Sequence, residues 1–138
     1  MTVFVLEILL LDISNLLSHE NVVKDRVASL SSRILRDGFI KKAIAVDKSS
    51  FVVLDGHHRV EAARKIGLRR IPAIVLDYSS ERVIVTPYNI RKEDVIRAAL
   101  EGKRFPPKTT RHMISLEGHL FHISRIEPDV RLDIKALR

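Results

Sequence analysis

The stretch VVLDGHHRVEAARKIG, residues 52–67, contains the change of pattern that decides the fold. Its first residues are apolar and β-branched, which is typical of a buried strand, and this strand ends at Asp55. Gly56 permits a tight turn, and the residues that follow predict a helix that closes at Gly67. The sequence therefore predicts a strand, a glycine turn and a helix.

The first turn of that helix carries His57, His58 and Arg59. A helix N-terminus is already partly positive, so cationic side chains there are unfavourable unless an anion lies in front of them. With a phosphate bound, the backbone N–H groups and these side chains become one converging set of donors. The alternative is an ordinary Asp-Gly turn beside an accidental pair of surface histidines. A zinc site on the two sequential histidines is disfavoured, because both cannot easily face one ion from a helix.

Strands and helices alternate on both sides of this stretch. Before it, the pattern predicts a buried strand over residues 2–13, a loop over 14–21, a helix over 22–37 capped by Gly38, and strands over 42–47 and 51–55. After it, we expect strands over 71–78 and 82–88 and a helix over 91–102, with Asn89 as its N-terminal cap and Gly102 as its stop. Residues 103–138 combine a Pro-Pro turn with short strand-like pieces.

The composition limits the classes of protein that are possible. With 138 residues, 46% of them hydrophobic, and no long apolar stretch, we expect a single globular domain that is soluble and cytoplasmic. The absence of cysteine excludes disulfides, thiolate nucleophiles, zinc-thiolate sites and iron-sulfur clusters. Glutamine is also absent, which favours a heat-adapted source. The net charge of +7 indicates an anionic partner such as a nucleic acid, a nucleotide or a phosphorylated metabolite, and a solvated basic surface is the alternative.

A second group of donors lies in FPPKTTRH, residues 105–112. After the stiff Pro-Pro pair, five consecutive side chains can donate hydrogen bonds, and no carboxylate interrupts them: Lys108, Thr109, Thr110, Arg111 and His112. Such a run can surround a phosphate or the carboxylate of an amino acid, and an exposed basic turn is the alternative. Neither the glycine-rich P-loop nor the dinucleotide-binding glycine motif is present.

Two carboxylates could do acid-base chemistry beside these donors. Glu20 follows His19 on the loop before the first helix, where an isolated His-Glu pair is usually structural. In a site dominated by cations, however, one carboxylate is useful as the general base that takes a proton from a hydroxyl. Glu20 and Asp55 are the two candidates.

Four stretches of this sequence carry a resemblance to a known family: DGHHR, FPPKTTRH, LLSHENVVKDRVASLSSRILRDGFIKKAIAV and VVLDGHHRVEAARKIGLRRIPAIVLDY. They resemble the ParB/sulfiredoxin superfamily and, within it, the free L-serine kinases of archaea. The resemblance implies an α/β (α+β) fold, a mixed β-sheet flanked by helices, in one domain over 1–138, with a core over about residues 1–80 and a substrate-binding part over about 81–138. The missing cysteine removes sulfiredoxin chemistry. The residues after IPAIVLDY show little helical periodicity for a DNA-reading domain.

The resemblance also implies a reaction, the transfer of a phosphoryl group from ATP, or from ADP, to the hydroxyl of free L-serine with the help of Mg²⁺. Glu20 would be the catalytic base, and Asp55 would assist it or hold the metal. The expected nucleotide- and phosphate-binding residues are Gly56, His57, His58, Arg59, Lys108, Thr109 and Thr110, and the serine-binding residues are Thr110, Arg111 and His112. A nucleotide-dependent DNA-binding module and a regulatory binder without turnover are the competing interpretations. We expect no membrane partner.

Overall fold

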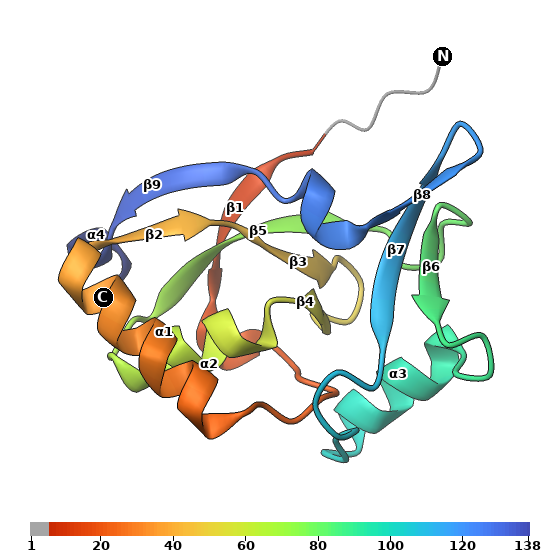
Figure 1. Ribbon diagram of the computed structural model, residues 1–138, viewed down its shortest axis with the longest axis horizontal. Helices are drawn as coiled ribbons and strands as arrows, with labels where there is room; N and C mark the ends of the chain where they lie inside the picture. The colour runs from red at the N-terminus through yellow and green to blue at the C-terminus, as the bar shows by residue number, and fades with distance from the viewer. Residues whose placement is uncertain (1–5) are drawn as a thin grey trace.

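The computed structural model describes residues 6–138, which are arranged around a four-stranded mixed sheet (Figure 1). The strand order is β1 (Ile8–Asp12), β5 (Arg70–Leu76), β3 (Ile44–Asp47) and β4 (Val53–Asp55). The central strands β3 and β5 are parallel, and both outer pairings are antiparallel. The predicted mixed sheet flanked by helices is confirmed. The first predicted strand began at residue 2, and its residues 2–5 lie outside the described part of the chain.

Two helices, α1 (Lys24–Asp37) and α2 (His57–Lys65), contact each other and bury their apolar residues in one core. Every second residue of the central strands points into this core, since successive side chains of a strand point to opposite faces. In β3, Ile44 and Val46 belong to the helical core, and Ala45 belongs to a second core on the other face. Both faces of the sheet are therefore covered, which explains why its central strands are almost entirely apolar.

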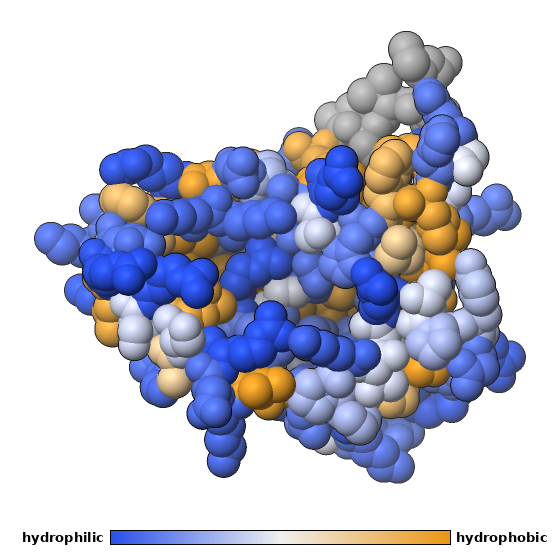
Figure 2. All heavy atoms as spheres, in the orientation of Figure 1, coloured by the Kyte–Doolittle hydropathy of each residue, from blue (hydrophilic) through white to orange (hydrophobic). Residues whose placement is uncertain are grey.

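A smaller antiparallel sheet builds the second core. It contains β6 (Val83–Thr86), β7 (Arg111–Leu116) and β8 (His119–His122), and α3 (Lys92–Leu100) contributes Val95 and Ala99 to the same core. Figure 2 shows that the face of the molecule turned toward the viewer in Figure 1 is mostly hydrophilic, with apolar side chains gathered over this smaller sheet.

The C-terminal segment returns to the first half of the fold. After a short 3-10 helix, Ile123–Ile126, strand β9 (Asp129–Asp133) pairs antiparallel with β2 (Phe39–Lys42), and α4 (Ile134–Leu137) places two side chains in the helical core. The sequence did not predict β2, because its partner lies about ninety residues away along the chain. This pairing crosses the boundary near residue 80 that the resemblance implied.

The predicted helix ends were partly right. Gly38 ends α1 with a left-handed backbone, as expected. Asn89 does not cap α3: this helix begins at Lys92, and the carboxylate of Asp94 accepts a hydrogen bond of 2.8 Å from the backbone N–H of Arg91. The acidic side chain inside the first turn therefore bonds back to the N–H of the residue that precedes the helix, in place of the predicted asparagine cap.

Gly56 is held where no other residue fits. Its φ of +106° is left-handed, and a Cβ at this position would overlap the side chain of Ile44. We expect Gly56→Ala to lower the free energy of unfolding by about 2 to 4 kcal/mol, from backbone strain and overpacking together. Gly67→Ala is the matched control in urea unfolding, because Gly67 has a similar φ of +83° but open space around it. Equal losses in the two variants would contradict this account.

Candidate functional site

Backbone hydrogen bonds hold His19 and Glu20 at the site. The N–H of Val53 in β4 donates to the carbonyl of Leu17 at 2.8 Å. Two residues further on, the N–H of Phe105 donates to the carbonyl of His19, and the N–H of Asn21 donates to the carbonyl of Phe105, both at 2.8 Å. The loop before α1 is thus held between β4 and the loop after α3, which joins residues that are about ninety positions apart.

The carboxylate of Glu20 is buried and oriented by Thr110. The hydroxyl of Thr110 donates to Oε2 of Glu20 at 2.7 Å, and Nε2 of His19 lies 3.1 Å from the same hydroxyl. Because a hydroxyl has one proton, His19 is then the donor in the second bond. Glu20 is only 7% exposed, so this chain of hydrogen bonds fixes its carboxylate at the wall of the site.

Histidine rings surround this carboxylate, and burial makes them neutral at pH 7. Burial lowers the pKa of His19 to about 4 and the pKa of His112 to about 3. The pKa of His57 is lowered well below its usual value, first by burial and then by the neighbouring histidines. The expectation that His57 acts as a cation at the start of α2 is therefore corrected, because desolvation disfavours the imidazolium form.

His58 and His112 are also engaged in the fold. Nε2 of His58 accepts a hydrogen bond of 3.0 Å from the backbone N–H of Val23, at the start of α1, and burial lowers its pKa. Nε2 of His112 lies 2.8 Å from the hydroxyl of Tyr78, deep in the second core. Both rings border the cavity described below, but each has one nitrogen committed to the protein.

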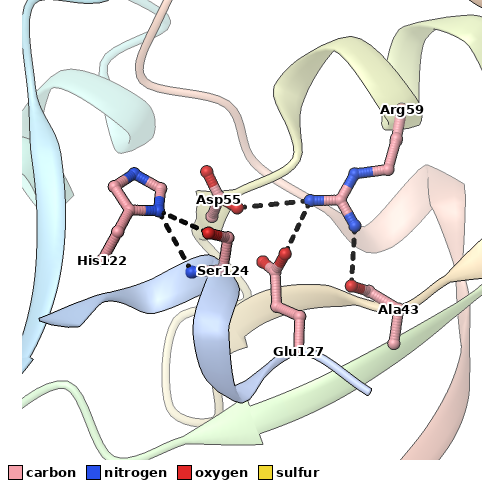
Figure 3. Close-up of polar contacts among 6 residues, drawn as sticks. All are labelled: Ala43, Asp55, Arg59, His122, Ser124 and Glu127. Carbon is pink, nitrogen blue, oxygen red and sulfur yellow. Dashed lines mark hydrogen bonds and ion pairs between the residues drawn. The ribbon is translucent and has the colours of Figure 1, made fainter. Parts of the chain in front are cut away.

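Arg59 is held by two carboxylates and a carbonyl (Figure 3). Its Nη2 lies 3.2 Å from Oδ2 of Asp55 and 2.9 Å from Oε1 of Glu127, and its Nη1 donates to the carbonyl of Ala43 at 2.7 Å. Asp55 ends β4, Arg59 lies in the first turn of α2, and Glu127 comes from the C-terminal segment. This arrangement favours a role for Arg59 in positioning Asp55. Its predicted contact with phosphate stays a prediction.

The pKa of Glu127 is raised to about 8, chiefly by burial. The neighbouring carboxyl group of Asp55 contributes to the rise, and the guanidinium of Arg59 opposes it. A carboxyl group whose pKa is higher in the folded state stabilises the fold at low pH, and this contribution disappears as the pH rises through the folded-state pKa. The buried histidines act in the opposite sense, since their lowered pKa values cost stability as the pH falls below their unfolded-state pKa.

We therefore expect Glu127→Gln to change the pH dependence of unfolding. As the pH rises from about 5 to about 8, the melting temperature of the variant should rise relative to that of the wild type. The folded wild type keeps a proton on Glu127 that its unfolded chain releases, so this group lowers the stability of the wild type alone over this range. Taking the difference cancels the histidine contributions. Glu101→Gln, at an exposed position, is the control and should follow the wild type. Parallel curves for Glu127→Gln and the wild type would show that Glu127 is ionised throughout.

His122 is a further donor at the site, from the end of β8. Its Nδ1 accepts a hydrogen bond of 3.1 Å from the backbone N–H of Ser124 and lies 2.8 Å from the hydroxyl of the same residue (Figure 3). A backbone N–H can only donate, so neutral His122 carries its proton on Nε2. Nε2–H is thus the ring group left for a ligand of the cavity that His122 lines.

Most of the side chains described above line one cavity of about 630 Å³. It is bordered by Glu20, Asn21, Arg26, Leu30, Leu54, Asp55, Gly56, His57, His58, Arg59, Lys108, Thr110, Arg111, His112 and His122. The structure thus brings the two predicted donor clusters and both candidate carboxylates together. Thr109 is the exception: it does not line the cavity, and its hydroxyl donates to the carbonyl of Pro106 at 2.6 Å, which closes the turn.

Three exposed cations define the charge of the cavity. Within residues 6–138, Arg26, Lys108 and Arg111 form no ion pair with a carboxylate. They come from the start of α1 and from the loop that leads into β7, and they stand on the same cavity as the N-terminus of α2. An anion bound among them would meet both unpaired side chains and free backbone N–H groups.

Four residues of this arrangement were not predicted from the sequence: Asn21, Arg26, His122 and Glu127. Arg26 lies on the polar face of a predicted amphipathic helix, and this pattern alone usually indicates solvent. Asn21 directly follows the His-Glu pair and could have been included with it. His122 and Glu127 had no local signal, because the pairing of β8 with β7 places His122, and the C-terminal segment that returns to β2 places Glu127.

The fold and the cavity define this chain as a mixed α+β domain with a cleft lined by cationic side chains, and comparison with solved structures agrees on the fold. A free serine kinase in complex with AMP matches with a TM-score of 0.77, at 14% identity, over 95% of this chain and 93% of that one. A conserved hypothetical protein from Pyrococcus furiosus matches with a TM-score of 0.76, at 16% identity, over the full length of both chains.

The family follows from the sequence. The ParB N-terminal domain family matches residues 2–87, and the chain belongs to this family, which confirms the resemblance to the ParB group. Curated relatives include a ParB-like protein of Sulfolobus acidocaldarius, 45% identical over 51% of this chain and 35% of the relative, and an ATP-dependent L-serine kinase of Staphylothermus marinus, 36% identical over 56% and 32%. An ADP-dependent L-serine kinase of Thermococcus kodakarensis is 27% identical over 62% of this chain and 37% of the relative. These matches span about a third of the relatives' length. Among residues 6–138, no helix is long and apolar enough to cross a membrane.

Proposed function

We propose that the chain is a nucleotide-dependent kinase that phosphorylates the hydroxyl of free L-serine to give O-phospho-L-serine. The observation that carries this proposal is the buried carboxylate of Glu20, held by Thr110 at the wall of a cavity with three unpaired cations. Support also comes from the ATP- and ADP-dependent L-serine kinases among the relatives and from the free serine kinases that share the fold.

Phosphoryl transfer needs in-line positioning, stabilisation of the charge on the transferred group and an acceptor for the hydroxyl proton. In this proposal Glu20 accepts the proton of the serine hydroxyl. Arg26, Lys108 and the N-terminal N–H groups of α2 bind the nucleotide phosphates. A group fixed before the reaction costs little reorganisation, which is the benefit of the hydrogen bond from Thr110.

Serine also needs a partner for its own carboxylate. Of the three residues predicted for this role, Thr110 is bonded to Glu20 and His112 to Tyr78. Arg111 therefore remains the best candidate, because its guanidinium matches a carboxylate in shape and charge. Nε2–H of His122 offers a neutral donor on the same cavity.

The expected donor is ATP, with Mg²⁺. The ATP-dependent relatives, at 36% and 32% identity, are more similar to this chain than the ADP-dependent relative, at 27%. Asp55 would contribute to the metal site. Its carboxylate borders the cavity while one oxygen is bonded to Arg59, which fits a Mg²⁺ carried mainly by phosphate oxygens and water.

The deciding experiment crosses ATP and ADP with serine, threonine and homoserine in the presence of Mg²⁺ and measures the phosphorylated amino acid. We expect phosphoserine to form fastest with ATP. The absence of any product with both nucleotides would overturn the proposal. Discrimination against threonine and homoserine should be moderate, since a single methyl or methylene is worth about 1 to 3 kcal/mol.

A nucleotide-dependent DNA-binding module is the second candidate, favoured by the ParB family match, the relative named ParB-like protein and the charge of +7. In residues 77–138, however, α3 and the four-residue α4 are separated by three strands, so this segment forms no helix-turn-helix. DNA affinity that falls steeply and linearly with the logarithm of salt concentration would support this candidate. No binding at low salt would dismiss it.

A further inference from the structure

A second type of ligand site lies within the cavity wall. His19, Glu20 and His57 each offer one ligand atom, and these atoms all lie within 4.8 Å of one another. Two imidazole nitrogens and one carboxylate oxygen are a donor set that zinc accepts, with one position left open for water or substrate. Sequence analysis considered zinc only between His57 and His58, which are neighbours in the chain. The structure instead pairs His57 with a residue 38 positions earlier.

His57 has no partner in the protein. Both of its ring nitrogens are buried, and neither forms a hydrogen bond within residues 6–138. A buried polar atom without a partner is costly, and nearly all such atoms in folded proteins are satisfied. The ring also stands edge-on to the ring of His19, with 4.6 Å between their centroids. An ion between the two rings would give one nitrogen of His57 a partner.

Burial keeps both imidazoles neutral at pH 7, so each ring has one nitrogen without a proton. For zinc to take Nε2 of His19, the proton that this nitrogen shares with Thr110 has to move to Nδ1, which changes the tautomer and not the charge of the ring. Some movement is needed, because ligand atoms around a four-coordinate zinc ion lie about 3.3 Å apart when each bond is about 2.0 to 2.1 Å. Side-chain rotation of His57 is available, since no hydrogen bond holds its ring.

We infer that His19, Glu20 and His57 bind a divalent transition metal of the zinc class, and that the bound ion blocks Glu20. Nitrogen ligands select zinc, cobalt or nickel over magnesium, which prefers oxygen. The site is thus distinct in chemistry from the Mg²⁺ expected with the nucleotide. The inhibitory part rests on the proposed function: a carboxylate bound to zinc cannot accept the proton of serine. The binding part does not depend on it.

Metal binding is tested without nucleotide. The whole protein is titrated with Co²⁺, whose visible absorption reports its coordination, and then with Zn²⁺ against a chromophoric chelator. We expect one equivalent to bind, and we expect His57→Ala or His19→Ala to weaken zinc binding at least about tenfold through the loss of a ligand. His119→Ala, at an exposed histidine of β8, is the matched control and should bind zinc as the wild type does.

Several results would overturn the site: no zinc binding, equal weakening in the His119 control, or full affinity in the folded His57 variant. Since an alanine in this position could unfold the chain, His57→Gln keeps a polar side chain and is compared by melting temperature. The kinase assay then separates the two proposals. Zinc binding without any phosphoserine production would overturn only the proposed function. An active kinase that zinc neither binds nor inhibits would overturn only the metal site.

Discussion

Replacing Glu20 by glutamine should reduce the formation of phosphoserine by about a hundredfold to ten-thousandfold, the usual contribution of a positioned general base. The amide has almost the same shape as the carboxylate and can still accept the hydrogen bond from Thr110, so the cavity should keep its form. It cannot take the proton of the serine hydroxyl. The measurement is kcat under saturating nucleotide and serine.

Nucleotide binding separates a lost base from a lost fold. The cations that we assign to the phosphates are untouched in Glu20→Gln, so calorimetry should give a nucleotide affinity close to that of the wild type. Glu101→Gln, an exposed glutamate at the end of α3, controls for the change of charge and should keep full activity. Full turnover in Glu20→Gln would show that the base is another group, and Asp55 would be the next to test.

Replacing Arg59 by methionine should lower the free energy of unfolding by about 1 to 3 kcal/mol, since Asp55, Glu127 and the carbonyl of Ala43 each lose a hydrogen-bond donor in a largely buried place. Glu127 has a side chain with 0% exposure, and Asp55 lies beside it. Without the guanidinium, two neighbouring carboxyl groups meet with no cation between them, and the carbonyl of Ala43 loses its donor. Urea unfolding measures the loss.

Arg64→Met is the matched control because it lies on the same helix, but at the surface. Its guanidinium is 3.6 Å from Glu61 with 48% of the side chain exposed, so its loss should cost less than about 1 kcal/mol. The double variant Arg59→Met with Glu127→Gln should recover part of the stability, because one unpaired acid is then removed. Equal stability of the two single arginine variants would contradict the structural role of Arg59.

The sequence predicted best those elements whose pattern is local. The strand that ends at Asp55, the turn at Gly56 and the helix that follows lie where the period changes from two to 3.6 residues. The helix α1 was found in the same way, with Gly38 at its end. Its predicted start was two residues early, since no side chain marks the beginning of the helix by a capping hydrogen bond.

The site was predicted as a list of residues rather than as a set of roles. Both donor motifs and both carboxylates do border the cavity, because each motif lies at the end of a strand or in a turn next to one. Whether a histidine is charged or an arginine is free, however, depends on burial and on distant partners. His57 became neutral through burial, and Arg59 became bonded to Glu127, a residue 68 positions later.

The sequence by itself determined the order of strands and helices from β3 to α3, the glycine turn before α2, the absence of thiol chemistry and an excess of positive charge. These features depend on near neighbours in the chain or on composition. The tertiary structure alone decided that β9 returns to β2, that Glu127 reaches Arg59, and that His19, Thr110 and Glu20 form one hydrogen-bonded group. The physical reason is that long-range pairing and desolvation depend on which surfaces meet in three dimensions, and no local pattern records them.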